Sequence, residues 1–116
     1  MNATFDRHAV LRRFRLLKKG RGRAALWLRV TAIEGFIVFE SGAGLVSAPA
    51  LVLEPGAFTT RRPPFEGMLS SYAGRGTITL QADAARFRID AFSGQLLDYV
   101  SNPARPADFE PPNSAV

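Results

Sequence analysis

The sequence predicts an α+β fold in which two helices pack on a mostly antiparallel sheet. The apolar residues recur with a helical period near the start of the chain and then alternate with a period of two, as in strands. The same succession of a strand, a helix and a group of strands occurs on both sides of Pro55-Gly56. This element order predicts an internal pseudo-repeat, although the two halves are not a strong sequence repeat. A length of 116 residues with 47% hydrophobic content is typical of one domain with one core.

The first helix follows a short strand, and Asp6 is its expected N-cap because a carboxylate accepts a free amide of the first turn. Gly20 and Gly22 are expected to end it. Successive helical residues lie about 100° apart, which places one apolar arc on the helix. The residues of this arc are Val10, Leu11, Phe14 and Leu17.

The rest of the first half is predicted to be strands. Alternation over residues 26–30, the turn signal Glu34-Gly35 and the segment 36–40 together predict a hairpin. Residues 45–53 predict another strand, which Pro49 interrupts. Because proline cannot donate to a ladder, this strand is expected at a sheet edge or at a bulge.

The second half repeats this order from residue 57. Residues 57–60 predict a short strand, Pro63-Pro64 can begin a helix, and Gly74 is its expected C-cap. The apolar face of this helix would consist of Phe65, Met68, Leu69 and Tyr72. A hairpin over residues 77–82 and 86–91 and a last strand over 95–100 complete a domain at 1–101. Four prolines then predict an extended tail at 102–116.

Positive charge is concentrated at the start of the chain. The net charge is +5, and nine of the 15 Lys and Arg residues lie in the first thirty positions, where Asp6 is the only acid. This distribution favours an anionic partner. The expected contacts are His8, Arg12, Arg15 and Lys19 on the helix face opposite the apolar arc, Arg21 and Arg23 in the following loop, and Arg61 and Arg62 before the second helix. A solvated charged face is the alternative, and a membrane-surface role is less favoured because the apolar arc is needed for the core.

The sequence offers few of the residues that catalysis or cofactor binding would need. There is no Cys and one His, and Gly20-Arg21-Gly22-Arg23 matches no phosphate-binding loop. A carboxylate site would require Asp83, Asp90 and Asp98 to converge. We therefore expect a non-enzymatic protein without a metal or cofactor. The strand aromatics, among them Trp27, Phe36, Phe39, Phe87 and Phe92, are interpreted as core residues and not as base-stacking platforms.

No apolar run approaches the ~20 residues that a transmembrane helix needs. The first twenty residues also lack the apolar segment of a secretory signal. The expected location is therefore cytoplasmic, with no membrane partner.

Several segments resemble, in order and spacing, the amino-terminal domain of the bacterial sliding clamp, the β subunit of the replicative DNA polymerase. The chain opens with Thr4-Phe5-Asp6-Arg7 and the paired aliphatics Val10-Leu11. A hairpin over 26–40 follows, then Glu54-Pro55-Gly56 and a second helix over 65–72. The exit is Arg105-Pro106-Ala107-Asp108-Phe109-Glu110-Pro111.

The resemblance implies a DNA-clamp-like domain in a ring whose helices face duplex DNA, with a role in the processivity of DNA replication. The expected partners are duplex DNA bound without sequence preference, replication or repair proteins, and further copies in a homo-oligomer. A bacterial clamp subunit has three such domains, whereas this chain has one. The second helix presents Glu66, Gly67, Ser70 and Ser71 instead of basic residues. The alternative interpretation is therefore a protein-interaction module, such as a decoy, an inhibitor or an adaptor, that uses the clamp fold without binding DNA.

Overall fold

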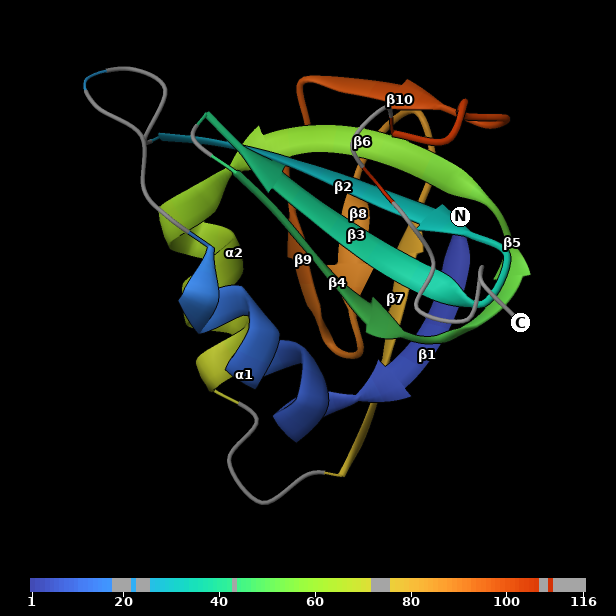
Figure 1. Ribbon diagram of the computed structural model, residues 1–116. Coiled ribbons are helices and arrows are strands. Elements are labelled where there is room, and N and C mark those ends of the chain that lie inside the picture. The colour runs from blue at the N-terminus through green and yellow to red at the C-terminus, as the bar shows by residue number, and fades with distance from the viewer. Residues whose placement is uncertain (18–21, 23–25, 43, 72–75, 107–108, 110–116) are drawn as a thin grey trace.

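The computed structural model describes residues 1–17, 22, 26–42, 44–71, 76–106 and 109. Two helices and ten strands lie within these ranges (Figure 1). The first half comprises β1 (Asn2–Asp6), α1 (Arg7–Leu16), β2 (Trp27–Ile33), β3 (Phe36–Ser41), β4 (Gly44–Pro49) and β5 (Leu51–Glu54). The second half comprises β6 (Gly56–Arg61), α2 (Arg62–Ser70), β7 (Thr77–Ala82), β8 (Phe87–Ile89), β9 (Phe92–Gly94) and β10 (Asp98–Val100).

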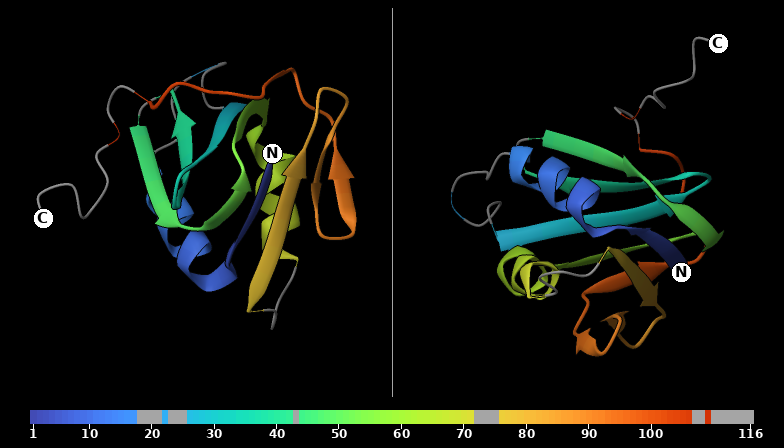
Figure 2. Two further views of the ribbon diagram at one scale, coloured as in Figure 1. Left: turned by 90° about the vertical axis from the view of Figure 1, so that its right-hand side faces the viewer. Right: turned by 90° about the horizontal axis from the view of Figure 1, so that it is seen from below.

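The strands form two five-stranded antiparallel sheets, which lie in separate layers (Figure 2). Sheet A has the order β5-β1-β7-β8-β9 and sheet B has the order β10-β6-β2-β3-β4. The helices lie next to each other on one side of the two sheets (Figure 1). The predicted α+β class with two helices on antiparallel sheet is confirmed, and the strands divide equally between two sheets.

An internal pseudo-symmetry relates the two halves. When each strand is exchanged for its counterpart in the other half, five strands away, the order of sheet A becomes the order of sheet B. The first helical residues, Arg7 and Arg62, are 55 positions apart, and so are Met1 and Gly56 at the starts of the two halves. The predicted pseudo-repeat is therefore present in three dimensions.

The core lies between the sheets and beneath the helices, and both halves contribute aromatic rings to it. Phe14 of α1 packs edge-on against Phe39 at 5.3 Å and stacks on Phe65 of α2 at 6.1 Å between ring centroids. Phe58 stacks on Phe87 at 5.1 Å. These contacts join both helices to both sheets, so neither half closes its apolar surface without the other.

The chain changes sheets at Pro49 and Ala50. β4 is an edge strand of sheet B, and β5, which follows one residue later, is an edge strand of sheet A. This sheet order confirms the predicted edge position of Pro49. A proline is tolerated there because its missing amide removes no ladder hydrogen bond.

The strand assignments after residue 86 differ from the prediction. β8 ends at Ile89 and a turn follows, in which Asp90 has a φ of 48°. The Asp90 carboxylate accepts the Thr79 amide at 2.9 Å, and Asp tolerates this left-handed conformation better than most residues. The chain then forms an additional strand, β9, which pairs with β8 at the edge of sheet A, and the final strand β10 is confined to three residues that pair with β6 in sheet B.

The predicted extended tail contains a buried anchor. Phe109 is 4% exposed, and its ring lies 5.4 Å from Phe36, edge to face. Val38 and Ala57 are buried, but they face away from the core. Val38 stands between two core residues of β3, so its side chain lies on the other side of the sheet. Ala57 lies on that same side, because both residues pair with Thr31 in register. Residues 101–106 lead from β10 toward this outer side of sheet B (Figures 1 and 2), where Phe109 packs on Phe36. The domain boundary at residue 101 stays a prediction.

Candidate nucleic-acid interface

The helix α1 is anchored by its cap and by its apolar face. The Ala9 amide donates to Asp6 Oδ2 at 2.9 Å, which confirms the predicted N-cap. The predicted apolar arc is fully buried, with Phe14 at 0% and Leu17 at 2% exposure. The helix ends at Leu16, earlier than predicted, because Leu17 is already extended and its amide bonds to the Phe14 carbonyl.

The opposite face of α1 presents basic side chains to solvent. His8, Arg12 and Arg15 are exposed, and so is Arg13, which lies beside the predicted arc. Within the described ranges none of these four side chains forms a hydrogen bond or an ion pair. Lys19, Arg21 and Arg23 lie outside the described residues. The α1 face therefore carries three arginines that no carboxylate of the described part neutralises, and such a surface favours phosphate contact.

A groove of about 400 Å³ runs between α1 and β4. Arg12 and Arg13 line it on the helix side, and Pro49 lines it on the strand side. Leu16 also lines it and is 65% exposed. We call this surface the α1 groove, and it places two of the exposed cations beside a sheet edge.

The arginines before α2 have different environments. Arg61 is exposed at the end of β6. Arg62 is 3% exposed, and its Nη2 donates to the Leu17 carbonyl at 2.8 Å, with the guanidinium 5.0 Å from the centre of the Phe14 ring. This burial corrects the expectation for Arg62: its side chain is held inside the fold and is not at the surface where a phosphate would bind.

Arg7, the first residue of α1, has the reciprocal arrangement. It is 7% exposed, and its Nε and Nη2 donate to the carbonyls of Leu69 and Ser70 at 3.2 Å each. Each helix therefore begins with a buried arginine whose guanidinium caps the end of the other helix. A positive charge at a helix C-terminus stabilises the carbonyls that lack intrahelical partners. An arginine at the start of each helix, at Arg7 and at Arg62, is the sequence signal that could have pointed to this pair.

The exposed side of α2 lacks cations, as the sequence predicts. Gly67, Ser70 and Ser71 are exposed and Glu66 is half-buried. The hydroxyls of Ser70 and Ser71 donate to the Glu66 and Met68 carbonyls of the same helix at 2.9 and 2.8 Å. These side chains turn back on their own helix, so α2 offers little to a polyanion.

The three isolated aspartates serve separate local structures. Asp83 accepts the Ala85 and Arg86 amides in its turn, and these hydrogen bonds lower the pKa of its carboxyl. Asp90 accepts the Thr79 amide, and Asp98 Oδ1 lies 3.3 Å from Arg29 Nη1. Among the residues that the structure describes, no three His, Cys, Asp or Glu side chains gather as metal ligands.

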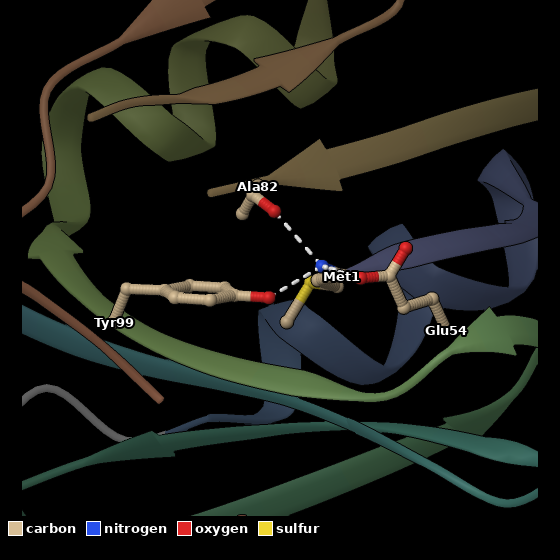
Figure 3. A network of polar contacts seen from close by, with 4 residues as sticks. All are labelled: Met1, Glu54, Ala82 and Tyr99. Atoms are coloured by element: carbon tan, nitrogen blue, oxygen red, sulfur yellow. Dashed lines mark hydrogen bonds and ion pairs between the residues drawn. The ribbon is translucent and has the colours of Figure 1, made fainter. Parts of the chain in front are cut away.

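The chain's amino group lies in a polar network where the two halves meet (Figure 3). The Met1 ammonium donates to the Ala82 carbonyl at 2.8 Å and to Tyr99 Oη at 2.6 Å, and Glu54 Oε1 is 3.8 Å away. Burial and the nearby Glu54 carboxylate raise the pKa of the Tyr99 phenol. A Cβ on Gly56 would come within 2.8 Å of Met1 Cβ, so glycine permits this close approach.

The strand aromatics divide into two groups. Phe39 and Phe87 are buried, as predicted, and Phe36 is partly covered. The prediction of core packing is wrong for Trp27 and Phe92, which are 40% and 47% exposed. Trp27 is the first residue of β2 and lies on the face opposite the buried Leu28. The alternation of side chains along the strand could therefore have predicted its exposure.

Neither a known family profile nor a curated protein sequence matches the chain. Solved structures do match, and two of them are sliding clamps of Caulobacter crescentus, described as pol III beta and as a beta sliding clamp with bound polyethylene glycol. Each is 14% identical over 93% of this chain, with TM-scores of 0.64 and 0.62. This chain has the fold of one sliding-clamp domain.

The clamp-like domain spans about a third of the length of those clamp chains, since it covers 33% of each. An identity of 14% establishes the fold of the clamp-like domain and not its activity. Neither helix of the described chain is long and apolar enough to cross a bilayer.

Proposed function

We propose that this clamp-like domain is a non-enzymatic, cytoplasmic protein that contacts duplex DNA through its phosphates, with the exposed face of α1 as the contact surface. The observation that carries the proposal is the set of exposed cations on one side of α1, none of which pairs with a described carboxylate. The clamp fold supports it, because both helices lie on one side of the sheets. Contacts to phosphate position a protein without reading sequence, which suits sliding.

The domain is proposed to act in a replication or repair assembly, as a homo-oligomer or with other clamp-like domains. A domain that spans a third of a clamp chain requires further copies or partners to surround a duplex. The exposed basic residues of α1 are His8, Arg12, Arg13 and Arg15. Arg61 is also exposed, and it lies near the C-terminal end of α1, because its neighbour Arg62 bonds to the Leu17 carbonyl there. Lys19, Arg21 and Arg23 remain proposed contacts.

Titration of a fluorescent duplex tests this proposal. Three arginine–phosphate contacts predict a salt slope of about −2.7, and thus about 40-fold weaker binding at 200 mM than at 50 mM salt. The double variant Arg12→Glu/Arg15→Glu should weaken binding at 50 mM salt at least about 10-fold, with stability changed by less than about 0.5 kcal/mol per exposed site.

The matched variant is Glu66→Lys on α2, which adds a cation to the helix that lacks them. If both helices face one duplex, this change strengthens binding severalfold. An affinity for the duplex that does not change with salt concentration would contradict the proposal, and so would a double variant that binds as well as the wild type. Light scattering in the same buffer reports whether the protein is an oligomer.

The second candidate function is a protein-interaction module that does not bind DNA. The observation that favours it is the difference between the helices, because α2 presents glycine and serine where a DNA-lining helix would carry cations. A monomer that shows no DNA binding at 50 mM salt would favour this function over the first.

A further inference from the structure

A hollow of about 470 Å³ lies at one end of sheet A, and β5, β1, β7, β8 and the turn between β7 and β8 form its walls. This size is within the range of ligand-binding pockets in proteins. The hollow shares no lining residue with the α1 groove, or with the apolar groove beside α2 that Trp27, Met68 and Leu97 line. We call it the sheet A hollow. Its polar lining residues are Asn2, Glu54, Gln81, Asp83, Arg86 and Arg88.

One polar residue from each of four strands lies in a single row across the outer side of sheet A. Asn2 of β1 pairs in register with Glu54 of β5 and with Gln81 of β7. Gln81 in turn pairs with Arg88 of β8. Leu80, the neighbour of Gln81, is fully buried in the core, so Gln81 faces outward. Because side chains of cross-strand partners are close enough to interact, the row is a continuous polar strip.

The two ends of this row carry opposite charges. The Glu54 side chain is 68% exposed, and its Oε1 lies 3.8 Å from the Met1 amino nitrogen, which is too far for a hydrogen bond. At the other end, the Asp83 carboxylate accepts two amides of its turn, and the nearby Arg86 guanidinium offsets its charge. The Arg88 side chain is exposed and forms no hydrogen bond or ion pair within the described ranges. Arg88 therefore supplies the net positive charge at its end.

The middle of the row contains an acceptor that has no donor. Asn2 Oδ1 is buried, yet no hydrogen bond reaches it from the part of the chain that the structure describes. Native proteins leave few buried polar atoms unpaired, because burial removes the water that would otherwise bond to them. A molecule that brings a hydrogen-bond donor to the floor of the hollow would satisfy this atom.

The backbone around the sheet A hollow is fixed before any ligand binds. The Ala82 amide donates to the Met1 carbonyl at 3.0 Å, and the Met1 amino group donates back to the Ala82 carbonyl at 2.8 Å (Figure 3). The turn beside it is closed by the Asp83 amide, which donates to the Arg86 carbonyl at 3.0 Å. A preformed site of this kind lowers the entropic cost of binding.

We infer that the sheet A hollow binds a small zwitterion, a molecule with an ammonium group at one end and a carboxylate at the other. The ammonium group donates to Glu54 and to Asn2 Oδ1, and the carboxylate pairs with the Arg88 guanidinium. β5 and β8 are separated by β1 and β7, with about 4.8 Å between neighbouring strands, so the two charges of the ligand must be several bonds apart. The inference does not depend on duplex binding, because the hollow is formed by sheet A and not by α1.

The test compares four probes that differ in charge or length. These are ε-aminocaproate, hexylamine, caproate and γ-aminobutyrate, and binding is followed at low salt by NMR spectroscopy of the Asn2 and Gln81 side-chain amides. We expect saturable binding of ε-aminocaproate, and about fivefold weaker binding of hexylamine and of caproate, since each lacks one exposed ion pair. The γ-aminobutyrate ion should also bind more weakly, because its charges are closer together.

Variants of the row assign each end of the probe. Arg88→Gln should remove the preference for ε-aminocaproate over hexylamine, and Glu54→Gln should remove the preference over caproate. Asn2→Ala should weaken binding without lowering the melting temperature of the unliganded protein, because its acceptor has no partner to lose. The matched control is Arg61→Gln, the same change at an exposed arginine of sheet B, and it should leave binding unchanged.

Three outcomes would overturn the inference. They are the absence of saturable shifts at Asn2 and Gln81, equal affinity for the four probes, and equal loss of affinity with Arg88→Gln and Arg61→Gln. The result is independent of the duplex titration, since Arg12→Glu/Arg15→Glu should leave binding of ε-aminocaproate unchanged. Failure of one proposal is thus distinguishable from failure of the other.

Discussion

The half of the molecule from β1 to β5 and the half from β6 to β10 have the same elements in the same order, yet they present different surfaces. Helix α1 carries exposed arginines and borders a basic groove, whereas α2 carries glycine and serine and borders an apolar one. The residues that hold the halves together are equivalent, with a buried arginine at the start of each helix. Pseudo-symmetry therefore persists in the contacts that build the fold and is lost on the surfaces available to partners.

The largest expected effect is at the two buried arginines. If the two halves contribute equally to stability, replacing either arginine should lower the free energy of unfolding by the same amount. Arg7→Met and Arg62→Met keep the apolar stem but leave the carbonyls at the ends of α2 and α1 without their charged donors. Each should lower the free energy of unfolding by about 3 kcal/mol, measured by urea denaturation.

The control for this pair is Arg61→Met, because Arg61 is exposed and adjacent to Arg62 in the chain. It should change stability by less than about 0.5 kcal/mol. A cost at one buried arginine with none at the other would show that only one helix depends on its reciprocal cap, and the comparison would fail.

A smaller effect is expected where the starts of the two halves meet. Gly56→Ala places a methyl group within 2.8 Å of Met1 Cβ and 3.0 Å of Tyr99 Oη, so Met1 must shift. The expected loss of unfolding free energy is about 2 kcal/mol. Gly67→Ala on α2 is the matched substitution, and it should stabilise by about 0.5–1 kcal/mol because nothing lies within 4 Å and alanine favours helix. Equal effects of the two changes would refute the close contact.

The smallest effect concerns alkaline pH at the same junction. The pKa of Tyr99 is raised above 10.0 in the folded state, so its contribution to stability is complete below pH 10.0. It is lost as pH rises from there toward the folded pKa, since the unfolded chain releases the phenolic proton first. The melting temperature should therefore fall more steeply above pH 10 in the wild type than in Tyr99→Phe. Parallel curves for the two proteins would contradict this assignment.

Local sequence signals were sufficient for much of the fold. The helical spacing that ends at Leu17 and the cap at Asp6 predicted both the buried face of α1 and its exposed cations. Pro49 predicted an edge strand, because the missing amide of proline acts wherever proline stands. These features depend on residues close together in the chain, and their physics is local.

The candidate site could be predicted only in part, for the same reason. The exposure of Arg12 and Arg15 follows from helix periodicity. Arg61 and Arg62 are adjacent arginines, and the sequence pattern does not show that one is exposed and the other buried. What separates them is the direction of each side chain relative to α1. Arg62 points to the Leu17 carbonyl and the Phe14 ring, which the sequence places 45 and 48 positions away.

The sequence by itself determined that this chain alternates strands with two amphipathic helices and that its cations gather on the first helix. Only the tertiary structure decided that the strands form two sheets, that Phe109 covers the outer side of sheet B, and that Trp27 and Leu97 form a groove. The physical reason is that a burial pattern specifies which side of an element is apolar, but not what covers it. That choice is made by contacts between residues far apart in the chain, when both halves close one core.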